Sequence, residues 1–381
     1  MAKLGEVCIQ ITDGSHNPPS GVEQSEYLML SSKNIDDDFI TLDSPRFLSH
    51  SDYIAENKRT TVSEGDLLMT IVGTVGRVAI VPKELNGICL QRSVAVIKPE
   101  REIVNNRYLM YQLQNMRPFL EKEARGVAQK GIYLKQVSQL DIKLPELEQQ
   151  KQIVKVLDKV TELISLRKQQ LTKLDELVKA RFVEMFGDPV KNTMDWEIKS
   201  LSELGEINRG VSKARPRNSP ELLGGPYPLI QTGEVANAKT YITSFNSTYS
   251  EKGLAQSKMW PKGTLCITIA ANIAQTSILT FDACFPDSVV GFISRNMTNE
   301  LFIHYWFSFF QKILDEQAPQ VAQKNINLKI LSELNVIVPP LSLQNRFAAF
   351  VECVDQQKQT VQQSLEKLEV MKKALMQEYF G

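Results

Sequence analysis

The sequence predicts an α+β protein with two α/β domains in a tandem pseudo-two-fold repeat, separated by a long antiparallel two-helix coiled coil. Three observations support this fold class. The chain repeats itself in order at an offset of about 194 to 200 residues. Each repeat begins with short β-rich runs punctuated by Gly and Pro, and each ends in a long segment with heptad spacing. The 381 residues suffice for two or three domains that each bury a core.

The repeat is visible as a collinear series of matches. Leu-Gly-Glu at 4–6 recurs at 204–206, and Val-Ala-Gln-Lys at 127–130 recurs at 321–324. Gln150 then recurs as Gln344, and the offset of 194 persists to the last residue. Such a series with small stepwise deletions indicates a tandem duplication of one structural unit.

The first part of each repeat has mixed character. The segment Asp66 to Val81 predicts two strands around a turn at 73–76. Val104 to Gln114 and Leu301 to Leu314 predict a helix at the same place in each copy. The acidic run at 36–38 is expected to form a solvated turn.

The second part of each repeat predicts a long helix, roughly Glu148 to Phe186 and Leu343 to Phe380. Proline precedes each helix, at Pro145 and at 339–340, and a glycine follows each one, which are helix start and stop signals. At 1.5 Å per residue each helix would span on the order of 55–60 Å.

Both helices carry an apolar residue at every seventh position, which predicts coiled-coil packing. Ordinary burial against the adjacent domain is the alternative, but two helices of equal length with partly polar flanks favour pairing with each other. The predicted seam consists of Leu157, Ile164, Leu171, Val178 and Met185 in the first helix and Phe347, Val354, Val361, Leu368 and Leu375 in the second.

Composition limits the partners. The chain has 44 Lys and Arg against 44 Asp and Glu, which excludes a histone-like polycation but leaves room for a local basic groove. Five scattered cysteines without a CxxC pair indicate reduced thiols in a cytoplasmic protein. The N-terminus has no apolar signal core, and no run approaches the roughly 18 apolar residues of a membrane span, so no membrane partner is expected.

No catalytic constellation is evident. A phosphate-binding G-x-x-x-x-G-K-[ST] loop is missing, and the three histidines lie far apart without ligand spacing, so no metal site is predicted. Asn-Pro-Pro-Ser at 17–20 has serine where the motif of amino-group DNA methyltransferases needs an aromatic ring to stack the flipped base. We therefore interpret it as a Pro-rich loop.

Features suited to DNA binding are clearer. The loop at 208–218 holds four basic residues and no acid, and its Gly210 and Pro216 favour an extended, exposed loop. Arginine can bind guanine bidentately and glutamine can bind adenine, although a merely solvated loop is the alternative. The repeated Val-Ala-Gln-Lys places a lysine at the same position in both copies, Lys130 and Lys324. This recurrence favours a shared role, either as a phosphate contact or as a structural tie to the helix. The candidate DNA-binding residues are Lys58, Arg59, Thr74, Arg77, Gln91, Arg92 and Lys130 in the first copy and Arg209, Lys213, Arg215, Arg217, Asn272, Gln275 and Lys324 in the second.

Several segments carry a resemblance to a known family. They are LPELEQQKQIVKVLD at 144–158, VPPLSLQNRFAAFVE at 338–352, DLLMTIVGTVGRVAIVP at 66–82, VAQKGIYLKQ at 127–136, GTLCITIAANIAQTSIL at 263–279 and ACFPDSVVGF at 283–292. With two domains and two long helices, the chain resembles the specificity (S) subunit of type I restriction-modification enzymes over nearly its whole length. It departs at Glu146, where the second copy has Pro340, and in LSLQ, which lacks the acidic residue usual before the glutamine.

The resemblance implies a non-catalytic DNA reader. Residues 1–145 and 189–338 would be target recognition domains that each read one half of a split, asymmetric sequence in double-stranded DNA. The helices at 146–188 and 339–381 would set the spacer between the halves and dock two modification (methyltransferase) subunits. Those partners would use S-adenosylmethionine, and restriction (motor-nuclease) subunits would use ATP and Mg; no cofactor is expected in this chain. The alternatives are a coiled-coil scaffold linking two protein-binding domains without DNA contact, and a self-contained restriction enzyme.

Overall fold

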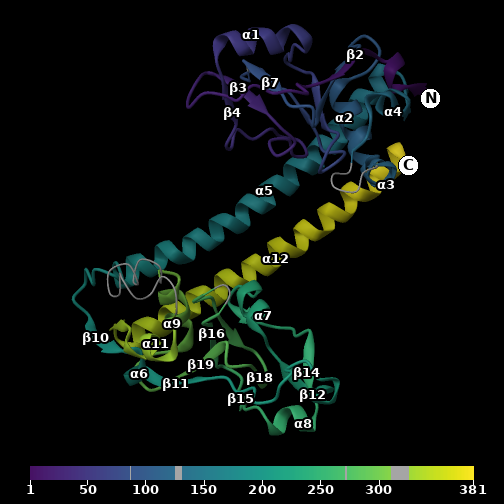
Figure 1. Cartoon of the computed structure of the whole chain (residues 1–381). Coiled ribbons are helices and arrows are strands. Elements are labelled where there is room, and N and C mark those ends of the chain that lie inside the picture. Colours follow the sequence, from purple (N-terminus) through teal and green to yellow (C-terminus); the bar gives the residue numbers. More distant parts are fainter. Residues whose placement is uncertain (86, 125–130, 271–272, 310–325) are drawn as a thin grey trace. The chain divides into compact units, whose positions relative to one another are not determined.

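The computed structural model describes residues 1–85, 87–124, 131–270, 273–309 and 326–381. The chain divides into two compact units (Figure 1). Unit 1 comprises Met1–Lys168 with Gln363–Gly381, and unit 2 comprises Gln169–Gln362. The division falls inside the two long helices, α5 (Leu147–Phe186) and α12 (Leu341–Phe380), so each unit contains one globular part and a segment of both helices.

Unit 1 is built on an antiparallel sheet in the order β2-β8-β5-β6 and a smaller sheet in the order β4-β3-β7, in which β3 and β7 run parallel. Helix α1 covers β3 and β7 (Figure 1). The strands are β1 (Ala2–Lys3), β2 (Cys8–Asp13), β3 (Tyr27–Leu30), β4 (Arg46–Leu48), β5 (Leu67–Thr70), β6 (Val78–Ile80), β7 (Ile88–Leu90), β8 (Val94–Pro99) and β9 (Asp141–Ile142). The helices besides α5 and α12 are η1 (Leu4–Glu6), α1 (His50–Arg59), α2 (Asn106–Asn115), α3 (Arg117–Glu123) and α4 (Leu134–Ser138).

Unit 2 repeats this plan with the strand order β11-β19-β16-β17-β13 in one sheet and β14-β12-β18-β15 in the other. Its strands are β10 (Glu197–Ser200), β11 (Gly205–Arg209), β12 (Leu223–Leu229), β13 (Tyr241–Ile242), β14 (Ser247–Tyr249), β15 (Met259–Trp260), β16 (Leu265–Thr268), β17 (Thr276–Leu279), β18 (Ala283–Cys284), β19 (Val289–Ser294) and β20 (Asn335–Val338). The helices besides α5 and α12 are α6 (Leu201–Leu204), η2 (Pro220–Leu222), α7 (Thr232–Asn237), α8 (Glu251–Ala255), α9 (Glu300–Phe307) and α11 (Leu328–Glu333). The duplication inferred from the sequence therefore extends to the order of the strands.

The predicted hairpin at Asp66–Val81 is confirmed as the antiparallel pair β5 and β6. The predicted end of the helix at Leu301–Leu314 is wrong, because α9 stops at Phe307. The residues from 310 onward lie outside the described part of the chain. The hydroxyl of Ser308 donates to the carbonyl of Tyr305 at 2.6 Å, a local bond that competes with helix continuation.

The acidic turn at 36–38 is half-buried and paired, not simply solvated as predicted. Asp36 lies 3.6 Å from the guanidinium of Arg77, Asp37 pairs with Arg117, and Asp38 lies 3.6 Å from the ammonium of Lys372 on α12. The sequence pattern could not identify these partners because they lie far away along the chain.

Within each unit the two helix segments pack antiparallel. In unit 1 Leu157, near the start of α5, shares a core with Phe380, at the end of α12. In unit 2 Phe182 and Phe186, near the end of α5, share a core with Phe347, near the start of α12. Of the predicted seam, Leu157, Ile164, Val178, Phe347, Val354 and Val361 are buried, and Leu171, Met185, Leu368 and Leu375 are half-buried.

A buried glutamine joins α5 to the globular part of unit 1. The side chain of Gln150 is fully buried, and its Oε1 accepts from the backbone N–H of Asn105 at 2.8 Å. Its Nε2 donates to the carbonyls of Ile103 at 3.2 Å and Pro145 at 2.8 Å. Asn105 caps α2, so this one side chain ties the start of α2 to the start of α5.

Gln344 makes the same connection in unit 2. It is fully buried, and its Oε1 accepts from the backbone N–H of Asn299, which caps α9, at 3.3 Å. Its Nε2 donates to the carbonyls of Met297 at 3.0 Å and Pro339 at 2.8 Å. The matched glutamines are thus explained as the polar joint between each globular part and its helix.

Candidate nucleic-acid interface

In unit 2 the chain leaves β11 by crossing directly over the turn between β18 and β19. The N–H of Gly210 donates to the carbonyl of Val289 at 2.8 Å, and that of Val211 donates to the carbonyl of Phe285 at 3.0 Å. A Cβ on Gly210 would lie 2.3 Å from the oxygen of Phe285, so only glycine allows this approach. We call residues 209–217 and 285–289 the unit 2 crossing.

Unit 1 contains the same crossing. The N–H of Gly14 donates to the carbonyl of Val94 at 3.2 Å, and that of Ser15 donates to the carbonyl of Leu90 at 2.7 Å. A Cβ on Gly14 would lie 2.1 Å from the oxygen of Leu90. We call residues 13–19 and 90–94 the unit 1 crossing. The Pro-rich loop at 17–20 therefore begins in the structural counterpart of the basic loop, an equivalence that sequence reasoning missed although a glycine directly follows a strand in both copies.

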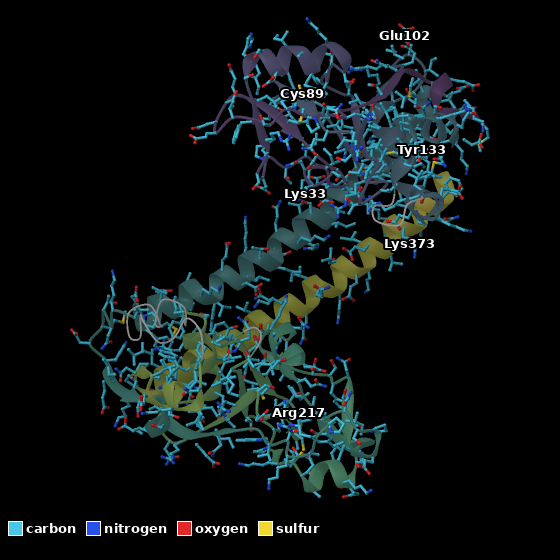
Figure 2. All side chains as sticks on the ribbon, in the orientation of Figure 1. Lys33, Cys89, Glu102, Tyr133, Arg217 and Lys373 are labelled. Carbon is cyan, nitrogen blue, oxygen red and sulfur yellow. The ribbon has the colours of Figure 1, made fainter. Side chains whose placement is uncertain are left out.

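In the unit 2 crossing, two arginines meet an acid from the other loop. Arg217 Nη2 lies 2.5 Å from Asp287 Oδ1, and Arg215 Nη2 lies 3.9 Å from Asp287 Oδ2. Arg215 Nη1 also donates to the carbonyls of Ser212 and Ala214, both at 2.8 Å. The basic loop contains no acid in its own sequence, but the fold supplies one. Figure 2 shows Arg217 in the part of unit 2 that holds β14, β15 and β18.

The unit 1 crossing has the reverse distribution of charge. Arg92 is exposed on the turn before β8, at the position equivalent to Asp287, and its N–H donates to the carbonyl of Ser15 at 2.9 Å. On the other loop His16 Nε2 lies 2.8 Å from Asp13 Oδ2, and Ser15 Oγ donates to Glu56 at 3.0 Å. The turn therefore carries a basic side chain, Arg92, in unit 1 and an acidic side chain, Asp287, in unit 2.

A second pair of equivalent candidates lies at the hairpin turns. The N–H of Arg77 donates to the hydroxyl of buried Thr70 at 2.9 Å, and the N–H of Gln275 donates to the hydroxyl of buried Thr268 at 3.0 Å. Arg77 therefore occupies in unit 1 the position that Gln275 occupies in unit 2. Arginine suits guanine and glutamine suits adenine.

Comparison with known proteins identifies the family. A family model described as the type I restriction modification DNA specificity domain matches residues 29–176 and 193–370. The chain belongs to this family. Its two matched segments reproduce the internal duplication, so it is a type I specificity chain with two specificity domains.

Individual relatives of the chain are also specificity subunits of type I restriction enzymes. The specificity subunit of the type I restriction enzyme MjaVIII of Methanocaldococcus jannaschii is 22% identical over 349 residues, covering 84% of this chain and 79% of that protein. The EcoBI specificity subunit of Escherichia coli is 36% identical over 100 residues, covering 26% of this chain and 21% of that protein.

Two solved structures share the fold. One, from a study of complex assembly and conformational transition of the type I R-M system, has a TM-score of 0.59 at 19% identity and covers 100% of this chain and 96% of that chain. The S subunit of M. genitalium has a TM-score of 0.58 at 14% identity, and the match covers 100% of this chain and 95% of that chain.

The other predicted contact residues of the specificity chain are distributed over its surface. Lys58 is exposed on α1, Thr74 is exposed in the unit 1 hairpin, Gln91 is half-buried beside Arg92, and Arg209 and Lys213 are exposed in the unit 2 crossing. The side chain of Arg59 and the residues Lys130, Asn272 and Lys324 lie outside the described residues.

Titratable groups in the described part of the specificity chain form no metal site, since no group of three or more His, Cys, Asp or Glu there could hold a metal ion. Burial raises the pKa of the Cys89 thiol to about 12. Burial and the nearby Lys358 ammonium lower the pKa of His304 to about 4, and its Nδ1 lies 2.9 Å from the hydroxyl of Thr276. Among the described residues no helix is long and apolar enough to cross a membrane.

Proposed function

We propose that this chain is the non-catalytic subunit that recognises the DNA target of a type I restriction-modification complex. The globular domain at 1–145 would read one half of a bipartite, asymmetric sequence, and that at 189–338 would read the other. The observation that carries this proposal is one backbone crossing, present in both units, that presents opposite charges at equivalent positions. A shared scaffold with different side chains is what two readers of different bases require.

The helices at 146–188 and 339–381 would fix the distance between the half-sites, as protein geometry does in dimeric DNA binders. A 40-residue helix spans about 60 Å. The two helices also expose large apolar side chains, which supports a role in docking two modification subunits. These side chains are Val156, Leu166, Leu177, Val183, Leu341, Val370 and Met371.

The partners would supply the chemistry. Modification subunits would methylate adenine with S-adenosylmethionine, and restriction subunits would use ATP and Mg to translocate and cut. The specificity chain itself would bind double-stranded DNA and hold no cofactor.

The test is to co-express the chain with the modification subunit of its own system and to map methylated adenines across the host genome. A bipartite motif is expected, and exchanging residues 1–145 for those of another specificity chain should change one half only. A motif that stays the same after the exchange would contradict the proposal. A scaffold without DNA contact predicts that charge reversal in the basic loop changes nothing.

A further inference from the structure

We propose that Asp287 holds Arg217 in position to read a guanine. These two side chains would then specify one G·C base pair in the half-site recognised by the domain at 189–338. This inference rests on the proposed function and deepens it. Arg217 acts as the specificity-determining residue and Asp287 as its positioning residue.

The geometry leaves the arginine both oriented and available. Arg217 is 42% exposed and Asp287 is 40% exposed, so the pair lies at the surface and not in the core. Among the described residues, the bond to Asp287 is the one side-chain hydrogen bond that Arg217 makes. A guanidinium has five N–H donors in a planar fork, so most of them remain free for a base edge.

The loop that carries Arg217 rests on a fixed base. The N–H of Ala214 donates to Gln256 Oε1 at 2.9 Å, and the hydroxyl of Ser257 donates to the carbonyl of Val211 at 2.7 Å. Together with the close approach at Gly210, these bonds hold the loop to the end of α8 and to the turn before β19. An arginine that is oriented before binding loses less conformational entropy when it meets its target.

The carboxylate favours a base edge over a phosphate as the target. Phosphate contacts depend on net positive charge, and Asp287 opposes that charge where Arg215 and Arg217 meet. At a base edge the carboxylate is useful, because an aspartate accepts from the N4 amino group of cytosine while arginine donates to O6 and N7 of guanine. An Arg–Asp pair therefore matches the two bases of a G·C pair.

The equivalent place in unit 1 does not offer this combination. Arg92 stands where unit 2 has Asp287, and the loop beside it, residues 13–19, carries Asp13 and His16 but no arginine. The inference therefore concerns the half-site of the domain at 189–338 alone, and the other half-site serves as an internal control.

The experiment uses the complex of the chain with its modification subunit, for methylation mapping and for binding to duplexes carrying the mapped motif. We expect a G·C pair in the half-site of the domain at 189–338, and we expect its replacement by A·T to weaken wild-type binding roughly 10- to 100-fold. R217A and R217K should both lose this discrimination, since lysine keeps the charge but not the planar fork. D287N should reduce the discrimination several-fold while the other half-site stays fixed.

Lys252→Ala is the matched control, because Lys252 forms an exposed ion pair with Glu221 at 3.2 Å in the same unit but outside the crossing. It should leave both half-sites unchanged. Equal weakening of binding to all duplexes by R217A, with an unchanged unfolding midpoint, would identify a phosphate contact and overturn the inference. Unchanged discrimination in R217A or D287N would overturn it as well. Failure of the wild-type complex to methylate a bipartite motif would instead refute the proposed function.

Discussion

The two crossings show which parts of this molecule are shared and which have diverged. In each unit the glycine after the first strand of the larger sheet and the residue that follows it donate their N–H groups to two equivalent carbonyls, so the main chain follows one path. The side chains on that path differ: Arg217 meets Asp287 in unit 2, whereas Arg92 in unit 1 stands at the position of Asp287. The backbone contacts of the crossing therefore define a shared scaffold, and the exposed side chains on it are free to differ between the units.

The largest expected effect concerns the buried glutamine that both units share. Gln150→Ala leaves one N–H and two carbonyls without their partner, and Gln344→Ala leaves one N–H, two carbonyls and the hydroxyl of Thr298 without theirs. Each buried polar group that loses its partner costs about 1–3 kcal/mol, so we expect each variant to lose about 4 kcal/mol of unfolding free energy. Urea unfolding followed by hydrogen exchange would measure the loss and locate it.

Gln149→Ala is the control, because Gln149 is exposed one residue earlier on α5. It should change stability by less than about 0.5 kcal/mol. If only one of the two glutamine variants were destabilised, the joint would not be equivalent in the two units.

A second prediction concerns a pH dependence of stability that His304 gives to unit 2 and that its counterpart in unit 1 cannot give. His304 in unit 2 has its pKa lowered to about 4, so it stays neutral when folded while an unfolded histidine gains a proton below about 6.5. The stability that this neutral form contributes is complete above about pH 6.5 and is lost as the pH falls toward 4, by at most about 3 kcal/mol. The corresponding residue of unit 1 is the buried Met110, which cannot titrate.

His304→Met places the unit 1 residue in unit 2. The variant should lose about 1 kcal/mol at neutral pH, since the bond to Thr276 disappears, but its stability should fall less steeply between pH 6.5 and 4. The check is the difference in urea midpoint between wild type and variant across that window. Parallel curves would contradict the assignment of the pH dependence to His304.

A third prediction tests the shared backbone of the crossings. Gly14→Ala and Gly210→Ala each place a methyl group within 2.1–2.3 Å of a backbone carbonyl oxygen, which cannot move aside as a flexible side chain can. Both should lose about 2 kcal/mol of stability. Gly233→Ala is the control, because no atom lies within 4 Å of its added Cβ and it sits inside α7, where alanine is favoured. Thermal unfolding would rank the three, and a neutral Gly210→Ala would show that the crossing is not tightly packed.

Part of this architecture could be predicted from the sequence because its signals are local or periodic. The hairpin at Asp66–Val81 and the heptad residues Leu157 and Phe347 follow from spacing alone. Phe182 and Phe186 are fully buried although they lie off the heptad row, because the end of α5 packs against Phe302 of α9 as well as against α12.

The candidate interface was less accessible to sequence reasoning. Asp287 lies 70 residues after Arg217, and only the strand order brings the two loops together. The equivalence of Gly14 and Gly210 is hidden in the sequence because the residues that follow each glycine differ. Residue chemistry therefore predicts candidate contact residues, but it does not predict the pairing that decides which of them are oriented.

The smallest expected effect concerns an ion pair that only one unit has. In unit 1 Asp158 Oδ1 lies 2.5 Å from Arg107 Nε and accepts from the hydroxyl of Tyr111 at 2.6 Å. Burial, with the hydrogen bond to Asp158, raises the pKa of Tyr111, so the phenol stays protonated and donates. The corresponding residues of unit 2 include the apolar Leu301, so the ion pair has no counterpart there.

Asp158→Asn should cost less than about 1 kcal/mol, because Arg107 and Asp158 are more than a third exposed and exposed ion pairs contribute little. The asparagine oxygen can still accept from Tyr111, so the loss should reflect charge alone. Screening by salt should therefore narrow the difference in urea midpoint between wild type and variant. A loss of several kcal/mol that salt does not reduce would mean that this pair supports the junction of α2 with α5 as strongly as Gln150 does, and that unit 1 holds its helix by a device that unit 2 lacks.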